Sequence, residues 1–216
     1  MKLIKFFSIS SIIIAPFLIF LSAIHFAGFS SSFYKEEFSR YNVEKNIPEA
    51  LEIHKNVMDF IKGKNDYLPD KFNGREKTHL QDVRRLVLLS KAILYSLTAS
   101  AGILIILSAR KLKKRIDLEQ FIGKILLFGG LLAITIAVLL FLLINLNFSS
   151  SFESFHKIFF QAGTYAFDPE YEIIVNIYPE ELFMDLGLRI AKFVTVVSFI
   201  FMAAGTLIFL RNKKIK

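Results

Sequence analysis

Long apolar stretches separated by polar segments dominate the sequence. Four stretches are mainly hydrophobic and long enough to cross a bilayer, at about residues 6–28, 86–109, 121–146 and 190–210. The hydrocarbon core of a bilayer is crossed by about 20 apolar residues of α-helix. The pattern therefore predicts an all-α membrane fold with four transmembrane helices, in which residues 1–216 form a single integral membrane domain.

Two polar segments, about 30–85 and 147–189, lie between the first and second helices and between the third and fourth. In the first of them, apolar residues recur at helical spacing from Pro48 to a stop at Gly63, which predicts a short amphipathic helix. Its apolar positions are Leu51, Val57, Met58 and Ile61. We expect this helix to lie on the membrane surface or to pack on the bundle.

A second helix start is predicted at Asn73. Glu76 stands three residues later, which is the spacing of a capping box, and the helix is expected to run on through His79 into the second apolar stretch. The second polar segment is less regular. It is broken at Asp168–Pro169 and Tyr178–Pro179, and the apolar residues 173–175 between these breaks are typical of a short strand or a buried extended piece.

The distribution of charge predicts the orientation of the chain. Although the formal net charge is +8, the basic residues gather at the N-terminus, in the 110–115 linker and in the tail, where 11 basic residues face only Asp117 and Glu119. The two polar segments hold 13 basic and 17 acidic residues. By the positive-inside rule, both termini and the linker are cytoplasmic, and the polar segments form an extracytoplasmic cap. The basic clusters are then contacts with anionic membrane lipids, and no nucleic-acid partner is expected.

Several kinds of chemistry are excluded or disfavoured by the residues present. The chain has no cysteine, so disulfides, thiolate nucleophiles and cysteine-based metal sites are excluded. It contains no serine nucleophile elbow, phosphate-binding glycine loop or zinc-protease helix motif. Glu76, His79, Asp82 and His156 have the donor types of a metal site, but they would have to be assembled across two segments. We therefore expect no metal and no other cofactor.

The first candidate group for catalysis is Glu76, His79 and Asp82. Offsets of three residues place them on adjoining parts of one helix face, where a carboxylate can hold an imidazole in one tautomer. A purely structural alternative remains open, because Glu76 can serve only as a cap and Asp82 can simply pair with Arg85.

The second candidate group surrounds His156. Phe155, Phe159 and Phe160 flank this histidine and can form a dry aromatic wall, in which desolvation favours the neutral imidazole that accepts a proton. A histidine that is hydrogen-bonded within a packed loop is the equally plain alternative. His25 is expected to be a structural residue near the outer end of the first helix. His54 is expected to be solvated on an exposed helix.

The ordered motifs resemble a family of four-helix bacterial membrane proteins that includes the lipoprotein intramolecular transacylase. The resemblance covers essentially the whole chain. It rests on Glu76-x-x-His79-x-x-Asp82-Val83 before the second apolar stretch, Phe155-His156-x-x-Phe159-Phe160, Asp168-Pro169, and Pro179 followed by Phe183 and Asp185. The chain departs from the family pattern at Ala162, where an asparagine is common, and at Tyr165, where a tryptophan is common.

The resemblance implies an acyltransferase in the bacterial cell membrane, with its active site on the outer face. His79 and His156 would be catalytic at the junction of cap and membrane, Glu76 and Asp82 would support His79, and the substrate pocket would contain Phe155, Phe159, Phe160, Arg84 and Tyr165. The implied substrates are diacylglyceryl-modified lipoproteins. The implied reaction moves the sn-2 acyl chain to the α-amino group of the N-terminal cysteine and gives a lyso-form lipoprotein.

Two imidazoles suit this reaction because an ester-to-amide transfer needs one proton removed from the amine and one delivered to the departing glycerol oxygen. Nucleophile and electrophile belong to one substrate, so no enzyme nucleophile is required. Which histidine is the base stays open at this point. The alternative is a non-enzymatic membrane protein, such as a transporter subunit or a sensor with a ligand-binding outer cap. Such a protein has no need for two histidines that meet at one depth.

Overall fold

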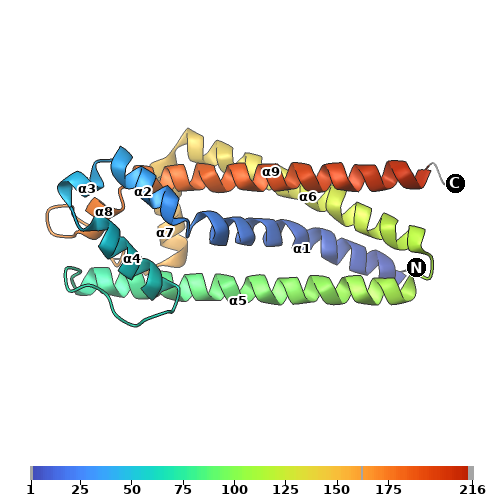
Figure 1. The fold of residues 1–216 in the computed structure, drawn as a ribbon, viewed down its shortest axis with the longest axis horizontal. Helices are drawn as coiled ribbons and strands as arrows, with labels where there is room; N and C mark the ends of the chain where they lie inside the picture. The colour runs from blue at the N-terminus through green and yellow to red at the C-terminus, as the bar shows by residue number, and fades with distance from the viewer. Residues whose placement is uncertain (1, 162, 214–216) are drawn as a thin grey trace. The chain divides into compact units, whose positions relative to one another are not determined.

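The computed structural model describes residues 2–161 and 163–213, and this part of the chain contains helices but no strand. Figure 1 shows the helices in chain order. They are α1 (Lys2–Ala27), α2 (Ser31–Arg40), α3 (Val43–Asn46), α4 (Ala50–Ile61), α5 (Gly74–Lys111), α6 (Arg115–Leu146), α7 (Phe148–Phe159), α8 (Ile174–Ile177) and α9 (Glu180–Lys213).

These helices fold as two compact units. The membrane unit contains residues 2–25, 92–142 and 189–213 of the described chain, and the loop unit contains residues 26–91 and 143–188. The long helices α5, α6 and α9 each pass from one unit to the other. The loop unit takes in the two segments from which a cap was predicted.

Four helices, α1, α5, α6 and α9, are long and apolar enough to cross a membrane. Large apolar side chains remain exposed on them, for example Phe6 at 62% and Ile200 at 60%. An apolar surface of this extent is unusual for a water-soluble monomer, and a surrounding bilayer accounts for it. The structure therefore confirms the predicted all-α fold with four membrane-spanning helices.

Small residues set the spacing of the helices in the membrane unit. A Cβ atom added to Gly205 of α9 would lie 2.7 Å from the carbonyl oxygen of Gly123 on α6. One added to Gly130 of α6 would lie 2.9 Å from the carbonyl oxygen of Ser198 on α9. A Cβ atom added to Gly129 would lie 2.6 Å from the Cβ of Ala15 on α1. Close backbone approach of this kind replaces hydrophobic burial as the source of helix association in lipid.

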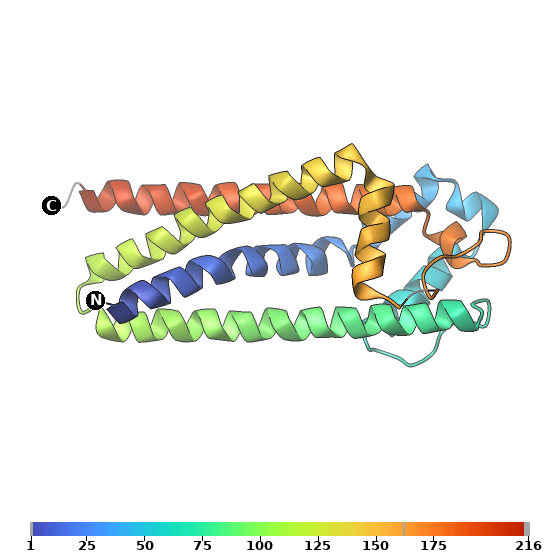
Figure 2. The ribbon, with the colours of Figure 1, turned by 180° about the vertical axis from the view of Figure 1, so that it is seen from behind.

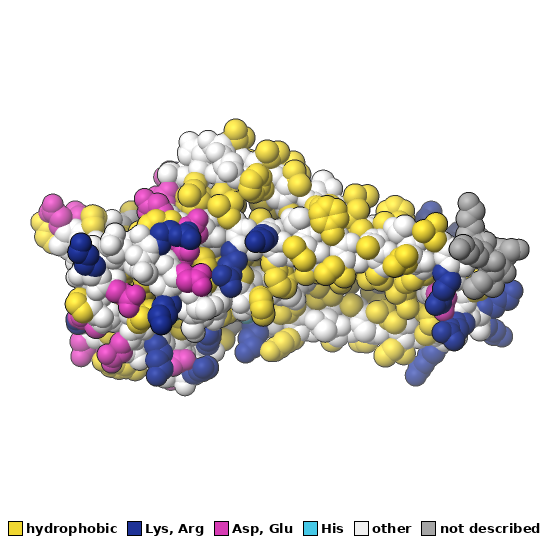
Figure 3. All heavy atoms as spheres, turned by 45° about the horizontal axis from the view of Figure 1, so that its top comes forward, with side chains coloured by type: hydrophobic (Ala, Val, Ile, Leu, Met, Phe, Trp, Pro, Cys, Tyr) yellow, Lys and Arg dark blue, Asp and Glu magenta, His cyan; other side chains and the backbone are white. Residues whose placement is uncertain are grey.

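Three basic segments meet at one end of the membrane unit. In both ribbon views, the start of α1, the α5–α6 connection and the end of α9 lie together (Figures 1 and 2). Lysine and arginine side chains gather at that end, while the coloured side chains along the visible face of the membrane unit are mostly hydrophobic (Figure 3). This grouping is the one that the charge distribution predicts. That this end faces the cytoplasm stays a prediction.

The loop unit has its own hydrophobic core, and its most buried apolar side chains come from α2, α4, the segment just before α5, α8 and the start of α9. They include Phe38, Val57, Phe72, Ile177 and Leu182. The expected strand or extended piece at residues 173–175 is absent from this described segment. The chain instead forms the single turn α8, because Tyr178 N–H donates to the carbonyl of Ile174 and Ile177 N–H donates to that of Ile173.

Helix α4 matches the predicted amphipathic helix, and Gly63 follows its end with a φ of 73° that favours glycine. The prediction that His54 is solvated was wrong. His54 lies on the buried face of α4 with Ile53 and Val57, is 5% exposed, and has its Nδ1 3.1 Å from the Tyr178 hydroxyl. Burial lowers the pKa of His54 to about 4, and the charge of Lys62 acts in the same direction.

Candidate functional site

Helix α5 begins with the predicted capping box. The Asn73 N–H donates to Glu76 Oε2 at 2.6 Å, and the Glu76 N–H donates to Asn73 Oδ1 at 3.0 Å. The other carboxylate oxygen of Glu76 accepts the N–H of Ile174 at 2.8 Å, and Glu76 is only 1% exposed. Glu76 thus joins the start of α5 to α8, a task different from the expected one of holding the His79 ring.

His79 lies one turn further along α5, seven residues before the apolar stretch that begins at Leu86. It is 8% exposed, and its ring centroid lies 4.7 Å from that of Phe160 and 5.4 Å from that of Phe167. Its Nδ1 has no hydrogen-bond partner among the described residues. Burial lowers the pKa of His79 to about 4, and the neighbouring His156 lowers it further, while the charge of Asp82 raises it. The ring is therefore neutral at pH 7.

His156 is held by the helix that carries it. Its Nδ1 lies 2.7 Å from the carbonyl oxygen of Phe152, one turn earlier on α7. A carbonyl only accepts, so Nδ1 carries the proton, and Nε2 of the neutral ring keeps a free lone pair. Helix α7 itself begins at Asn147, whose side chain accepts the N–H of Ser150 at 3.0 Å. The sequence had not predicted this helix.

The two histidines lie together. Their rings stack with centroids 6.0 Å apart and an interplanar angle of 22°. Phe160 packs on both, at 4.7 Å from His79 and 5.3 Å from His156. Tyr165, at 5.2 Å from His156, adds a further ring. The arrangement is a pair of imidazole rings in an aromatic enclosure, which offers nitrogen atoms that can donate or accept a proton.

The other predicted pocket residues vary in their placement. Phe155 packs edge-on against His156 at 5.7 Å and on Phe159 at 4.8 Å, but the two phenylalanines are 44% and 51% exposed. Asp82 forms an ion pair with Arg85 at 3.0 Å, as the structural alternative expected.

Arg84 binds residues of the segment before α5 and a ring of α4. Its guanidinium pairs with Asp66 at 2.7 Å, donates to the Asn65 carbonyl at 3.1 Å and covers the ring of Phe60 at 4.8 Å.

Ala162, where the chain departs from the family pattern, lies outside the described residues. No group of three or more His, Asp or Glu residues that could hold a metal converges in residues 2–161 and 163–213.

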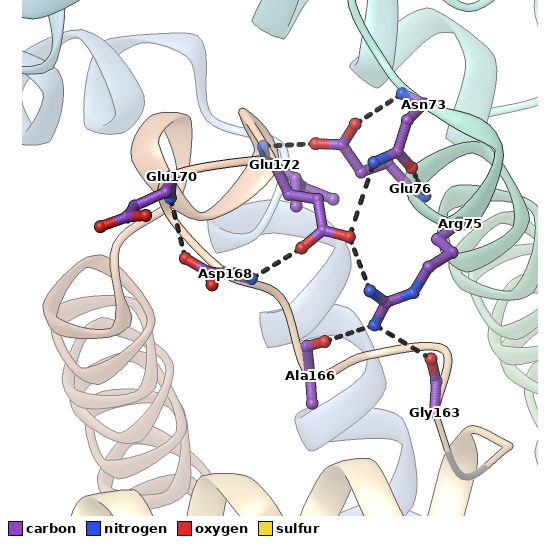
Figure 4. Close-up of polar contacts among 9 residues, drawn as sticks. Asn73, Arg75, Glu76, Gly163, Ala166, Asp168, Glu170 and Glu172 are labelled. Carbon is purple, nitrogen blue, oxygen red and sulfur yellow. Dashed lines mark hydrogen bonds and ion pairs between the residues drawn. The ribbon is translucent and has the colours of Figure 1, made fainter.

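A polar network beside the histidines joins the start of α5 to the segment between α7 and α8 (Figure 4). Arg75 donates to Glu172 at 2.8 Å and to the carbonyl of Ala166 at 2.6 Å, and Glu172 accepts the N–H of Asp168 at 2.7 Å. Sequence reasoning missed Arg75 and Glu172. No local pattern marks a pair of residues that stand 97 positions apart.

Comparison with solved structures finds the same fold in the membrane-integral lipoprotein intramolecular transacylase Lit from Bacillus cereus. The TM-score is 0.86 at 23% identity, covering 100% of this chain and 99% of that one. Two further structures of that protein, in which one histidine is replaced by arginine or by alanine, each give a TM-score of 0.81 at 22% identity. These cover 100% of this chain and 96% and 97% of theirs.

No curated protein sequence matches the chain. The model of the family described as lipoprotein intramolecular transacylase Lit, however, matches residues 9–183, which is well over half of the chain. The chain therefore belongs to the lipoprotein intramolecular transacylase (Lit) family.

Proposed function

We propose that this lipoprotein intramolecular transacylase moves the sn-2 acyl chain of a diacylglyceryl-modified lipoprotein to the α-amino group of the lipoprotein's own N-terminal cysteine. The product is a lyso-form lipoprotein. Family membership supports an acyltransferase that acts on lipoproteins, and it gives no support to a transporter subunit or a sensor. We place the reaction on the outer face of a bacterial cell membrane, on the strength of the charge distribution described above.

In this reaction the amine nitrogen attacks the ester carbonyl carbon, the C–N bond forms and the bond to the sn-2 oxygen breaks. The amine reacts only in its neutral form, so an ammonium group first loses a proton to water. One more proton then leaves the nitrogen, and one proton reaches the departing oxygen. The protons balance with no cofactor and no covalent enzyme intermediate.

His156 is suited to take the proton from the nitrogen. Its Nδ1 is committed to the Phe152 carbonyl, so Nε2 is the free acceptor, and the imidazolium that forms can return its proton to the sn-2 oxygen. His79 is suited to a different task. As a neutral imidazole with an unfilled hydrogen bond, it can donate to the substrate oxygen on which negative charge develops.

The observation that carries this proposal is the stacked pair of histidines, 6.0 Å between centroids, inside an aromatic enclosure. At this separation a small ester can lie beside both rings. Aromatic side chains around them keep water from competing for the acyl group.

The test is mass spectrometry of a reporter lipoprotein's N-terminal peptide in cells that carry each variant. We expect His79→Ala and His156→Ala each to lower formation of the lyso-form by about 10²–10⁴-fold at normal protein levels, because each removes one positioned proton donor or acceptor. His25→Ala is the histidine control. Wild-type product from either the His79 or the His156 variant would rule out that residue's role, and loss of product from the His25 variant would mean that the pair is misassigned.

A further inference from the structure

The segment between α7 and α8 supplies one ring to each histidine. Tyr165 packs on His156, and Phe167 meets His79 edge-on with centroids 5.4 Å apart. Residues 163–173 form neither helix nor strand, and Gly163 turns the chain with a φ of 86°. A segment with no regular backbone ladder of its own keeps its position only through other contacts.

Arg75 holds this segment at the point between the two rings. Its Nη2 donates to the carbonyl of Ala166 at 2.6 Å, and Ala166 is the residue between Tyr165 and Phe167. The same nitrogen reaches the Gly163 carbonyl at 3.3 Å, and the guanidinium lies 5.6 Å from the centre of the Phe167 ring. The planar guanidinium group of Arg75 therefore binds the stretch of backbone that carries the rings of Tyr165 and Phe167.

Glu172 fixes the other side of the guanidinium. It is 4% exposed, and it accepts Arg75 Nη1 at 2.8 Å on one oxygen and the Asp168 N–H at 2.7 Å on the other. A buried carboxylate with donors on both oxygens is held in one place, unlike the partners of an exposed ion pair, which contribute little. Figure 4 shows Arg75 between Glu172 and the two carbonyls.

Arg75 also stands four residues before His79 on α5, so the two side chains share one face of the helix. We propose that Arg75 and Glu172 are positioning residues of the transacylase, which fix Tyr165 and Phe167 against His156 and His79 and so set the geometry of the pair. The inference rests on the proposed role of the two histidines. Neither residue needs to touch the substrate.

Without the Arg75 guanidinium, the Ala166 and Gly163 carbonyls lose their hydrogen bonds, and the rings of Tyr165 and Phe167 are both held less firmly. A displacement of about 1 Å in a reacting group costs on the order of 10²-fold in rate, and loss of a residue that orients a catalytic group typically costs about 10–100-fold. Substrate binding depends on many more contacts. The effect should therefore appear mainly in kcat.

The experiment uses the purified full-length protein in nanodiscs with a synthetic diacylglyceryl lipopeptide and mass spectrometry of the product. Arg75→Gln and Glu172→Gln should each lower kcat by about 10–100-fold, with KM changed by less than about 3-fold. If the two residues act as one unit, the double variant should be about as slow as either single variant. Lys64→Gln is the matched control. It removes a cation from another ion pair of the loop unit, Lys64–Asp59 at 3.1 Å, and should leave kcat unchanged.

The apparent Tm of each variant is measured in parallel, so that kcat refers to folded protein. The positioning role is overturned if Arg75→Gln keeps wild-type kcat, if the two single effects multiply in the double variant, or if kcat falls only as far as folded protein is lost. His156→Ala separates this from failure of the proposed function. If the wild-type protein forms no lyso-form lipopeptide, or if His156→Ala is as active as wild type, the histidine mechanism itself has failed.

Discussion

The three histidines of the loop unit are held in different environments. His79 and His54 are both buried, and burial lowers the pKa of each to about 4. His156 instead has its tautomer fixed by the Phe152 carbonyl. None of these three rings is held by a carboxylate, the partner that the sequence had suggested for His79.

Two buried neutral histidines make the free energy of unfolding sensitive to acid. Each pKa is lower in the folded chain than the ordinary 6.5, so the unfolded chain binds more protons below pH 6.5, and stability is lost as the pH falls toward 4. At pH 5 this amounts to about 2 kcal/mol for each histidine. We expect the apparent Tm of the purified protein to fall between pH 7 and pH 5, with a smaller fall in His54→Leu. An identical pH dependence in that variant would contradict the assignment.

The burial of His54 was open to prediction from sequence alone. Ala50, Ile53, Val57 and Ile61 recur at helical spacing, and His54 stands on the same face as these residues. Its polar ring argued for the surface, but Tyr178, which supplies its hydrogen bond, is 124 positions away. The apolar spacing along α4 was therefore enough to predict that His54 is buried. The partner of its ring could not be predicted, because it is distant in the sequence.

At the scale of the helices, the long apolar stretches were the easiest to predict, because length alone identifies a membrane span. Helix α7 was missed. Its serines are weak helix formers, although Phe148, Phe152, Phe155 and Phe159 follow one another at helical spacing. Helix α2 was missed in the same way, since its buried face of Phe33, Tyr34, Glu37 and Phe38 includes a carboxylate.

The contact between α6 and α9 leaves no room for a side chain at Gly205. Gly205→Leu would place atoms against the backbone of Gly123 and Leu127, both 2.7 Å from an added Cβ, and backbone cannot move aside cheaply. We expect a clear loss in apparent Tm and in folded yield, measured after detergent extraction. Gly102→Leu on α5 is the matched control, because no atom lies within 4 Å of a Cβ there. Equal stability of the two variants would mean that the α6–α9 contact does not support the fold.

At the scale of the whole molecule, the number of spans and the grouping of the basic segments followed from composition along the chain. The network of Arg75, Glu76 and Glu172 did not. It joins residues more than 90 positions apart, partly by the Arg75–Glu172 side-chain pair and partly by bonds to a backbone carbonyl and a backbone N–H, and no local sequence pattern marks either kind of contact. The meeting of His79 with His156 was expected from the placement of their two motifs beside the apolar stretches and from the resemblance to a known family.

The orientation of the chain is testable because it has no native cysteine. Lys55 and Lys113 are both exposed and lie in segments of opposite predicted location. In intact cells, a membrane-impermeant maleimide should label Lys55→Cys and should reach Lys113→Cys only after the membrane is permeabilised, because the basic linker stays in the cytoplasm. Glu170→Cys should behave like the position-55 variant. The reverse pattern of labelling would place the histidine pair on the cytoplasmic face.

The aromatic enclosure should affect the pKa of a bound substrate amine as it affects the pKa of His79. The surroundings that lower the pKa of His79 also disfavour a positive charge on an amine brought beside it. A lipoprotein N-terminus that enters as ammonium therefore gives up a proton more readily there than in water. The reactive free amine forms beside the ester, and a trimethylated N-terminus, whose nitrogen has no lone pair, should be unreactive.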